Sequence, residues 1–138
     1  MEEINKSKIQ GPVTYLEVFD MPTSLHFYRD IIGFTVVYSS GEGDDVGWVM
    51  LQLNDSTLML NTAYDWDERP EKPDPVRTRG HADVTLYFGY PDIEELYKWL
   101  SGKGLDLTTP EVTKYNWKAT GLSDPDGYRV CFHWPVEE

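Results

Sequence analysis

The stretch Leu25-His26-Phe27-Tyr28-Arg29-Asp30-Ile31-Ile32-Gly33-Phe34 decides the fold of this chain. Its apolar side chains Leu25, Tyr28, Ile31 and Ile32 follow helical spacing, so we expect one face of a helix to pack on a core. Gly33 is expected to end this helix, because glycine readily adopts the left-handed conformation that follows a last helical turn.

The surrounding sequence predicts one strand before this helix and three strands after it. Residues 13–19 have strand character, and Asp20 or Thr23 is expected to cap the helix. The three later strands are expected at residues 34–39, 48–53 and 57–61, separated by segments with turn composition.

The same order of elements occurs a second time. A strand is expected at residues 84–88, followed by a helix that Pro91-Asp92 opens. The step from Asp20 to Asp92 is 72 residues, and a repeat at a fixed step indicates a duplicated structural unit. The apolar face of the second helix is expected to hold Ile93, Leu96, Tyr97 and Leu100, its end to lie at Gly102 or Gly104, and its three following strands to cover residues 105–108, 115–121 and 128–134.

Residues 64–80 separate the two copies and are rich in proline and charge, as linkers are. We therefore predict a single α+β domain over residues 1–138, with a first βαβββ module at about 11–63, a linker at about 64–80 and a second module at about 81–136.

The composition is that of a globular chain. Its 138 residues are 40% hydrophobic, enough to build one core. Cys131 is the only cysteine, so no internal disulfide is possible. No apolar run is long enough to cross a membrane, and the polar first ten residues are expected to form a loose lead-in without a secretory signal. We therefore expect a cytoplasmic location.

The charge is strongly acidic. The chain has 24 acidic and 12 basic residues, a formal net charge of −12. Phosphate recognition depends on Lys and Arg, so this balance argues against nucleic acid and anionic membranes as partners. The charge either maintains solubility or attracts a cationic ligand.

Two motifs carry a family resemblance. Residues 25–34 resemble the FYrdvLGF signature of the vicinal oxygen chelate superfamily, and Asp124-Pro125-Asp126-Gly127-Tyr128-Arg129-Val130 resembles its DPDG signature before the last strand. The similarity spans residues 13–136. It implies two tandem βαβββ modules that form a U-shaped mixed sheet around a cavity. The superfamily includes glyoxalase I, fosfomycin and bleomycin resistance proteins, extradiol dioxygenases and epimerases, so the fold alone leaves the chemistry open.

The resemblance also implies four metal-ligand positions, which in this sequence are Val13, Met59, Thr85 and Cys131. None is an imidazole or a carboxylate, the groups that such divalent ions prefer. The sequence therefore predicts no metal site and no cofactor. A displaced pair, Glu17 and His133, remains an alternative because both side chains are expected on the cavity side of their strands.

The cavity is expected to be aromatic with a few polar points, as small-molecule pockets usually are, although the same aromatic residues could simply fill a core. Either Trp48 or its neighbour Val49 is expected to point into the cavity, and so is either Trp117 or its neighbour Asn116. Cys131 next to His133 could act as a nucleophile, but a buried thiol that fills space is commoner. The predicted ligand-binding residues are Tyr15, Glu17, Trp48, Thr85, Tyr87, Trp117, Arg129, Cys131 and His133.

These features predict a metal-independent small-molecule binding protein with no catalytic residue. The closest resemblance is to the metal-free bleomycin-resistance branch, which implies a homodimer that sequesters a cationic or aromatic compound, such as an antibiotic, between its subunits. One alternative is a divalent-metal-dependent lyase or dioxygenase of the glyoxalase type with displaced ligands. Another is a metal-free catalyst, or a regulatory protein without a small ligand.

Overall fold

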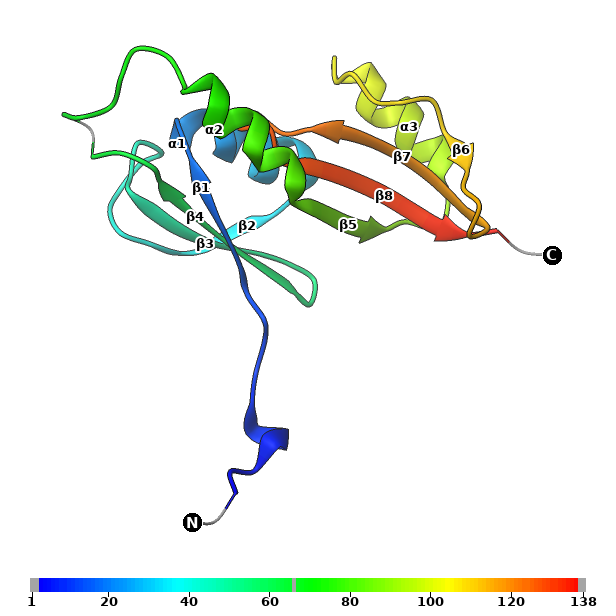
Figure 1. The fold of residues 1–138 in the computed structure, drawn as a ribbon, viewed down its shortest axis with the longest axis horizontal. Coiled ribbons are helices and arrows are strands. Elements are labelled where there is room, and N and C mark those ends of the chain that lie inside the picture. The colour runs from blue at the N-terminus through cyan, green and yellow to red at the C-terminus, as the bar shows by residue number, and fades with distance from the viewer. Residues whose placement is uncertain (1–2, 66, 137–138) are drawn as a thin grey trace.

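The computed structural model describes residues 3–65 and 67–136. Its first module is a four-stranded mixed sheet, which we call sheet A (Figure 1). The strand order is β1-β4-β3-β2, with β1 parallel to β4 and the other pairs antiparallel. The strands are β1 (Thr14–Val18), β2 (Thr35–Ser39), β3 (Trp48–Leu53) and β4 (Ser56–Thr62).

The second module repeats this arrangement in sheet B, with the order β5-β8-β7-β6 and a parallel β5–β8 pair. Helix α3 (Ile93–Gly102) packs beside this sheet. The predicted α+β fold with two tandem βαβββ modules is confirmed. The strands are β5 (Thr85–Gly89), β6 (Glu111–Val112), β7 (Trp117–Ser123) and β8 (Arg129–Pro135).

The helix of the first module begins and ends as predicted. The Asp20 carboxylate accepts a hydrogen bond from the Thr23 N–H and caps α1 (Met21–Leu25). The chain continues as a π-helical segment, η2 (His26–Ile32), and Gly33 ends it with a φ of 114°. Glycine is needed at this position because other residues resist a positive φ.

Each sheet buries one face and leaves the other open. In sheet A, Leu16 and Val18 of β1 and Leu58 and Leu60 of β4 are buried beneath the first helix. The buried side of sheet B contributes Val130 and Phe132 to the core, together with Ile93, Leu96 and Leu100 of α3. The alternation of strand side chains therefore turns a second set of residues, which includes most of the predicted site, to the open faces.

The turn before β8 joins the two modules. Buried Asp124 accepts a hydrogen bond from the Tyr28 hydroxyl, and Asp126 accepts hydrogen bonds from the Phe19 N–H (2.7 Å) and the Ser24 hydroxyl (3.1 Å). Burial raises the pKa of the Asp124 carboxyl to about 6 and also raises the pKa of Asp126. Two carboxylates of module 2 thus hold the start of the module 1 helix.

Two predicted segments differ from the structure. Residues 105–108 were expected to form a strand, and this is wrong: the first ladder of that region is β6, beyond Pro110. Thr108 bonds only to Thr120 and Gly121 of β7: its N–H donates to the Gly121 carbonyl, its hydroxyl accepts from the Gly121 N–H, and its carbonyl accepts from the Thr120 hydroxyl. Pro110 has no N–H to extend a ladder. The predicted linker contains a short helix, α2 (Pro75–Gly80), which Asp74 caps, followed by η3 (His81–Asp83).

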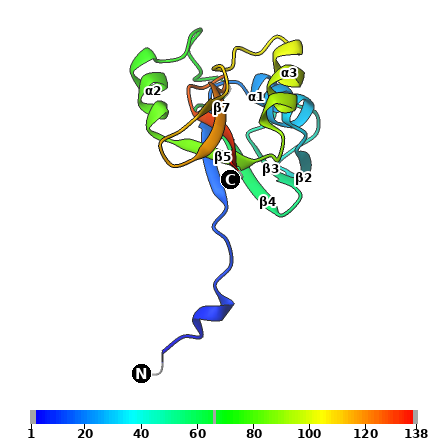
Figure 2. The same ribbon diagram turned by 90° about the vertical axis from the view of Figure 1, so that its right-hand side faces the viewer.

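The N-terminal residues form an arm that contains a short 3-10 helix, η1 (Lys6–Lys8), and projects away from both sheets (Figures 1 and 2). No helix among residues 3–65 and 67–136 is long and apolar enough to cross a membrane.

Candidate functional site

The open face of sheet A carries a row of large side chains. Register pairs Tyr15 with Met59, Met59 with Met50, and Met50 with Tyr38, so these four side chains lie side by side across the sheet. Trp48 is opposite Asn61 on the same face, whereas its neighbour Val49 is buried in the core. Trp48 is therefore the residue that this strand presents to the open face.

The open face of sheet B forms two adjoining cavities of about 590 and 280 Å³. Strand register brings together six predicted residues there, and Tyr87, Cys131 and Ala119 border both cavities. Thr85 and Arg129 line the larger cavity, and Trp117 and His133 line the smaller one.

Aromatic rings dominate the smaller cavity. The His133 ring lies between two others: its centroid is 4.7 Å from that of Trp117 and 5.3 Å from that of Tyr87. The Tyr87 ring meets it edge-to-face, and 66% of Tyr87 is exposed. Since these rings pack against one another on the open face of the sheet, they offer flat apolar surfaces to a ligand. We call Tyr87, Trp117 and His133 the aromatic cage.

The larger cavity is more polar. Threonines from three segments line it together with Arg129 and Glu111, so it offers hydroxyl groups and one charge of each sign. The sequence had not indicated Thr108, Glu111, Thr113 or Tyr115 as lining residues. Thr108, Glu111 and Thr113 belong to the segment around Pro110, where a strand was expected at residues 105–108; Glu111 and Thr113, polar residues on either side of Val112, were the signal available for β6. Tyr115 was expected at the start of the strand at residues 115–121.

Glu17 has a different environment from His133. Its carboxylate accepts a hydrogen bond from the Tyr15 hydroxyl at 2.8 Å, and the Arg77 guanidinium is 3.9 Å away. The hydrogen bond to Glu17 raises the pKa of Tyr15. Because Glu17 is on β1 of sheet A and His133 on β8 of sheet B, each with its own neighbours, the two do not form a pair within one chain.

The four positions where the fold family would place metal ligands do not fit a divalent ion. Val13, Met59 and Thr85 carry neither imidazole nor carboxylate, and burial raises the pKa of the Cys131 thiol, which favours its protonated form over a ligating thiolate. Within residues 3–65 and 67–136, no three His, Cys, Asp or Glu side chains lie close enough together to hold a metal ion.

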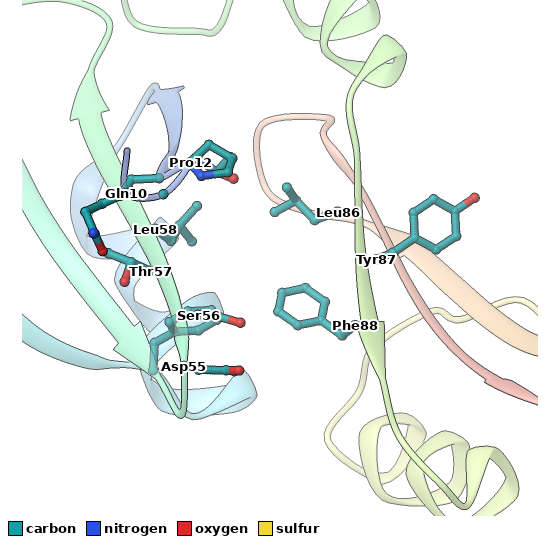
Figure 3. Close-up of a pocket in the computed structure, with 13 residues that line it drawn as sticks. Gln10, Pro12, Asp55, Ser56, Thr57, Leu58, Leu86, Tyr87 and Phe88 are labelled. Carbon is teal, nitrogen blue, oxygen red and sulfur yellow. The ribbon is translucent and has the colours of Figure 1, made fainter. Parts of the chain in front are cut away.

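A cleft between the modules is a further feature that the sequence did not reveal. It has a volume of about 590 Å³ and lies between the start of β4 and the edge strand β5 (Figure 3). Leu58 and Leu86 point toward one another across it, while the Tyr87 ring is turned away.

The family model described as "Glyoxalase/Bleomycin resistance protein/Dioxygenase superfamily" matches residues 11–132. The chain belongs to this superfamily. No curated protein matches it in sequence. Solved structures of the superfamily fold are similar to it over nearly its whole length, at sequence identities that establish the fold alone.

One such structure is a bleomycin resistance determinant encoded on the transposon Tn5, with 19% identity and a TM-score of 0.67, covering 94% of this chain and 100% of that one. A second is TnmS3, an antibiotic binding protein from Streptomyces sp. CB03234, with 17% identity and a TM-score of 0.66, covering 94% of this chain and 98% of that one. A third is a glyoxalase family protein from Enterococcus faecalis, with 22% identity and a TM-score of 0.64, covering 92% of this chain and 97% of that one.

Proposed function

We propose that this protein binds a planar, cationic or aromatic small molecule on the open face of sheet B, without a metal ion, and sequesters it unchanged. The observation that carries the proposal is the aromatic cage: three rings from β5, β7 and β8 whose centroids are 4.7 and 5.3 Å apart, beside a cavity of about 280 Å³. Rings in such an arrangement bind planar molecules by stacking and cations by their π faces.

The electrostatics support a cationic ligand. The chain has a formal net charge of −12, which raises the local concentration of cations near its surface. The chemistry of the family's ligand positions supports binding without a metal, since Val13, Met59, Thr85 and Cys131 offer no imidazole or carboxylate. The similar structures described as a bleomycin resistance determinant and an antibiotic binding protein support an antibiotic as one class of cargo.

The proposal includes a homodimer. Tyr15, Glu17 and Trp48 are on the open face of sheet A, apart from the cavities of sheet B. In the dimer that we propose, sheet A of a second copy covers sheet B, which adds these three residues to the same site and encloses the ligand.

Titration of the full chain with a cationic glycopeptide such as bleomycin, and with a planar cation such as ethidium, tests this proposal by calorimetry and tryptophan fluorescence. We expect saturable binding of at least one probe. Trp117→Ala should weaken it about tenfold, because a stacked ring in a binding centre contributes roughly 1.5 kcal/mol. Trp99→Ala is the matched control, since Trp99 is exposed on α3 outside both cavities.

Two further measurements separate sequestration from the alternatives. A chelator should leave the affinity unchanged, and mass spectrometry should recover the bound compound unaltered after long incubation. The proposal is wrong if neither probe binds, if chelation abolishes binding, or if the compound is converted.

A further inference from the structure

The two modules meet at two equivalent places. A step of 72 residues relates Tyr15 to Tyr87 and also Met59 to Cys131, the residues that face them in the parallel pairs β1–β4 and β5–β8. Tyr128 precedes Cys131 by three residues, and Ser56 precedes Met59 by three. Tyr128 and Ser56 therefore occupy equivalent positions: Tyr128 directly precedes β8, and Ser56 is the first residue of β4.

Tyr128 closes the first junction. The Ala63 N–H donates to the Val18 carbonyl, so the backbone groups of the even-numbered residues of β1 bond to β4. The backbone N–H and carbonyl of Glu17 therefore point to the other side of β1, which is the free edge of sheet A. The Tyr128 hydroxyl accepts a hydrogen bond from the Glu17 N–H (3.2 Å) and donates one to the Glu17 carbonyl (3.0 Å). The Tyr128 ring stacks on His81, with centroids 4.1 Å apart. The Tyr128 ring thus fills this junction, and its hydroxyl provides hydrogen-bond partners for the free backbone groups of Glu17.

The second junction is open. Ser56 has only a hydroxymethyl group where Tyr128 has a ring, and the cleft of about 590 Å³ lies at this place, between Asp55–Leu58 and β5 (Figure 3). The Arg129 N–H bonds to the Val84 carbonyl and the Tyr90 N–H to the His133 carbonyl, so alternate residues of β5 face β8. The backbone N–H and carbonyl groups of Tyr87 and Gly89 therefore face the free edge, where nothing in residues 3–65 and 67–136 bonds to them. The step of 72 residues relates Glu17 to Gly89, and Tyr87, two residues before it, is the free-edge residue that lines the cleft.

The lining of the cleft combines an apolar interior with a polar rim. Leu58 and Leu86 face one another across it, and the Phe34 and Phe88 rings meet edge-to-face with centroids 6.1 Å apart. On the module 1 side, Ser56 and Asp55 border the opening. Asp55 forms no ion pair within the part of the chain that the structure describes.

We propose that this cleft is a second binding site, separate from the one on sheet B, and that it takes a small phenol carrying an amine. The phenol ring lies among Leu58, Leu86 and Phe88, as the Tyr128 ring lies in the first junction. Its hydroxyl bonds to the Tyr87 backbone at the strand edge, and its ammonium group pairs with the Asp55 carboxylate. The ligand thus supplies the ring that Ser56 lacks.

Protein-observed NMR of the full chain, titrated with tyramine and with p-cresol, tests this proposal. We expect saturable shifts of the Leu58 and Leu86 methyl signals at millimolar concentration, about the affinity that so few ligand atoms allow. Tyramine is itself a cationic aromatic compound, so any shift of the Trp117 indole signal at the sheet B site should follow its own concentration dependence and should persist in the Ser56→Tyr variant. Tyramine should bind about fivefold more tightly than p-cresol, because an exposed ion pair contributes at most about 1 kcal/mol.

Two variants make the test specific. Asp55→Asn should remove the preference for tyramine and leave p-cresol binding intact. Ser56→Tyr should place the chain's own phenol in the cleft and weaken both ligands more than tenfold, whereas Ser39→Tyr, on the exposed edge strand β2, should change neither. The absence of saturable shifts, shifts confined to the aromatic cage, or an unchanged preference in the Asp55 variant would each overturn the proposal. If Ser56→Tyr does not fold, the Asp55 variant decides alone.

Discussion

At the residue scale, Gly127 lies at the most crowded point of the junction between the modules. Its φ is 90°, and a Cβ atom there would lie 2.4 Å from the backbone carbonyl oxygen of Thr78 in α2. Backbone cannot move aside as the end of a flexible side chain can. The glycine of the DPDG turn is therefore required by both its own conformation and the close approach of α2.

We predict that Gly127→Ala lowers the free energy of unfolding by about 2 kcal/mol or more, the sum of a strained positive φ and the clash with Thr78. Urea denaturation measures this change. The control is Gly102→Ala in α3, where a Cβ atom meets nothing within 4 Å and φ is not positive. It should raise stability by about 0.5 kcal/mol. Equal effects of the two substitutions would contradict the role of the turn.

The Asp124 carboxyl gives the junction a pH dependence with a definite sign. Its folded pKa of about 6 lies above the ordinary pKa of 3.8 for this group, because burial disfavours the charged form. The folded state therefore holds this proton more tightly than the unfolded state, and its contribution to stability falls as the pH rises from about 4 to about 6. Two pKa units correspond to about 3 kcal/mol.

Asp124→Asn removes this titration while its amide oxygen retains an acceptor for the Asp126 and Tyr128 N–H groups. We predict that the unfolding free energy of the wild type minus that of the variant decreases by about 2–3 kcal/mol from pH 4 to pH 7. Urea denaturation across this range tests it. A difference that stays constant with pH would show that the carboxyl is not the source.

At the scale of elements, the sequence predicted those structures whose signals are local. The structure contains both predicted helices. The first begins after Asp20 and ends at Gly33, and the second begins after Asp92 and carries the predicted apolar stripe. Residues 105–108 were wrongly expected to form a strand. Leu107 is apolar because its side chain is buried in the core, although it belongs to no strand. Helix α2 was missed among prolines and charges, although Asp74-Pro75 has the capping pattern of a helix start.

The site was predictable in part for the same reason. Alternation within a strand correctly indicates which side chains share a face, so Tyr87, Cys131 and His133 could be grouped from sequence. Whether two strands of different sheets approach one another is a tertiary property that alternation does not contain. Glu17 and His133 therefore seemed a possible pair, and the cleft at Ser56 depends on a gap between modules that no local pattern encodes.

The N-caps of α2 and α3 predict different effects on stability, because only α3 buries side chains in the core. Asp92 caps α3, which buries Ile93, Leu96 and Leu100, whereas Asp74 caps α2, which buries none of its residues. Asp92→Ala should lower the global free energy of unfolding by about 1 kcal/mol. Asp74→Ala should change it by less than about 0.5 kcal/mol and instead accelerate amide hydrogen exchange within α2. A global loss from Asp74→Ala would show that α2 unfolds together with the core.

At the scale of the whole molecule, both sheets expose large side chains that a monomer would leave in water. Tyr15 and Tyr38 on sheet A are 49% and 66% exposed, and Tyr87 on sheet B is 66% exposed. The row formed by Tyr15, Met59, Met50 and Tyr38 crosses all four strands of sheet A, so it is continuous and not a set of isolated residues. Continuous apolar faces of this kind are typical of surfaces that associate.

We predict that the chain sediments as a dimer of twice the 16.0 kDa chain mass. Tyr38→Lys should shift it toward monomer, because the new ammonium group would lie in the covered row. Trp99→Lys is the control; Trp99 is 52% exposed and lies on α3, outside both cavities of sheet B. Two copies that each carry a net charge of −12 repel one another, so added salt should strengthen the dimer by screening this repulsion. Sedimentation velocity at low and at physiological salt measures both effects. A monomer under both conditions would reject the shared site between two copies and leave sheet B to bind its ligand alone.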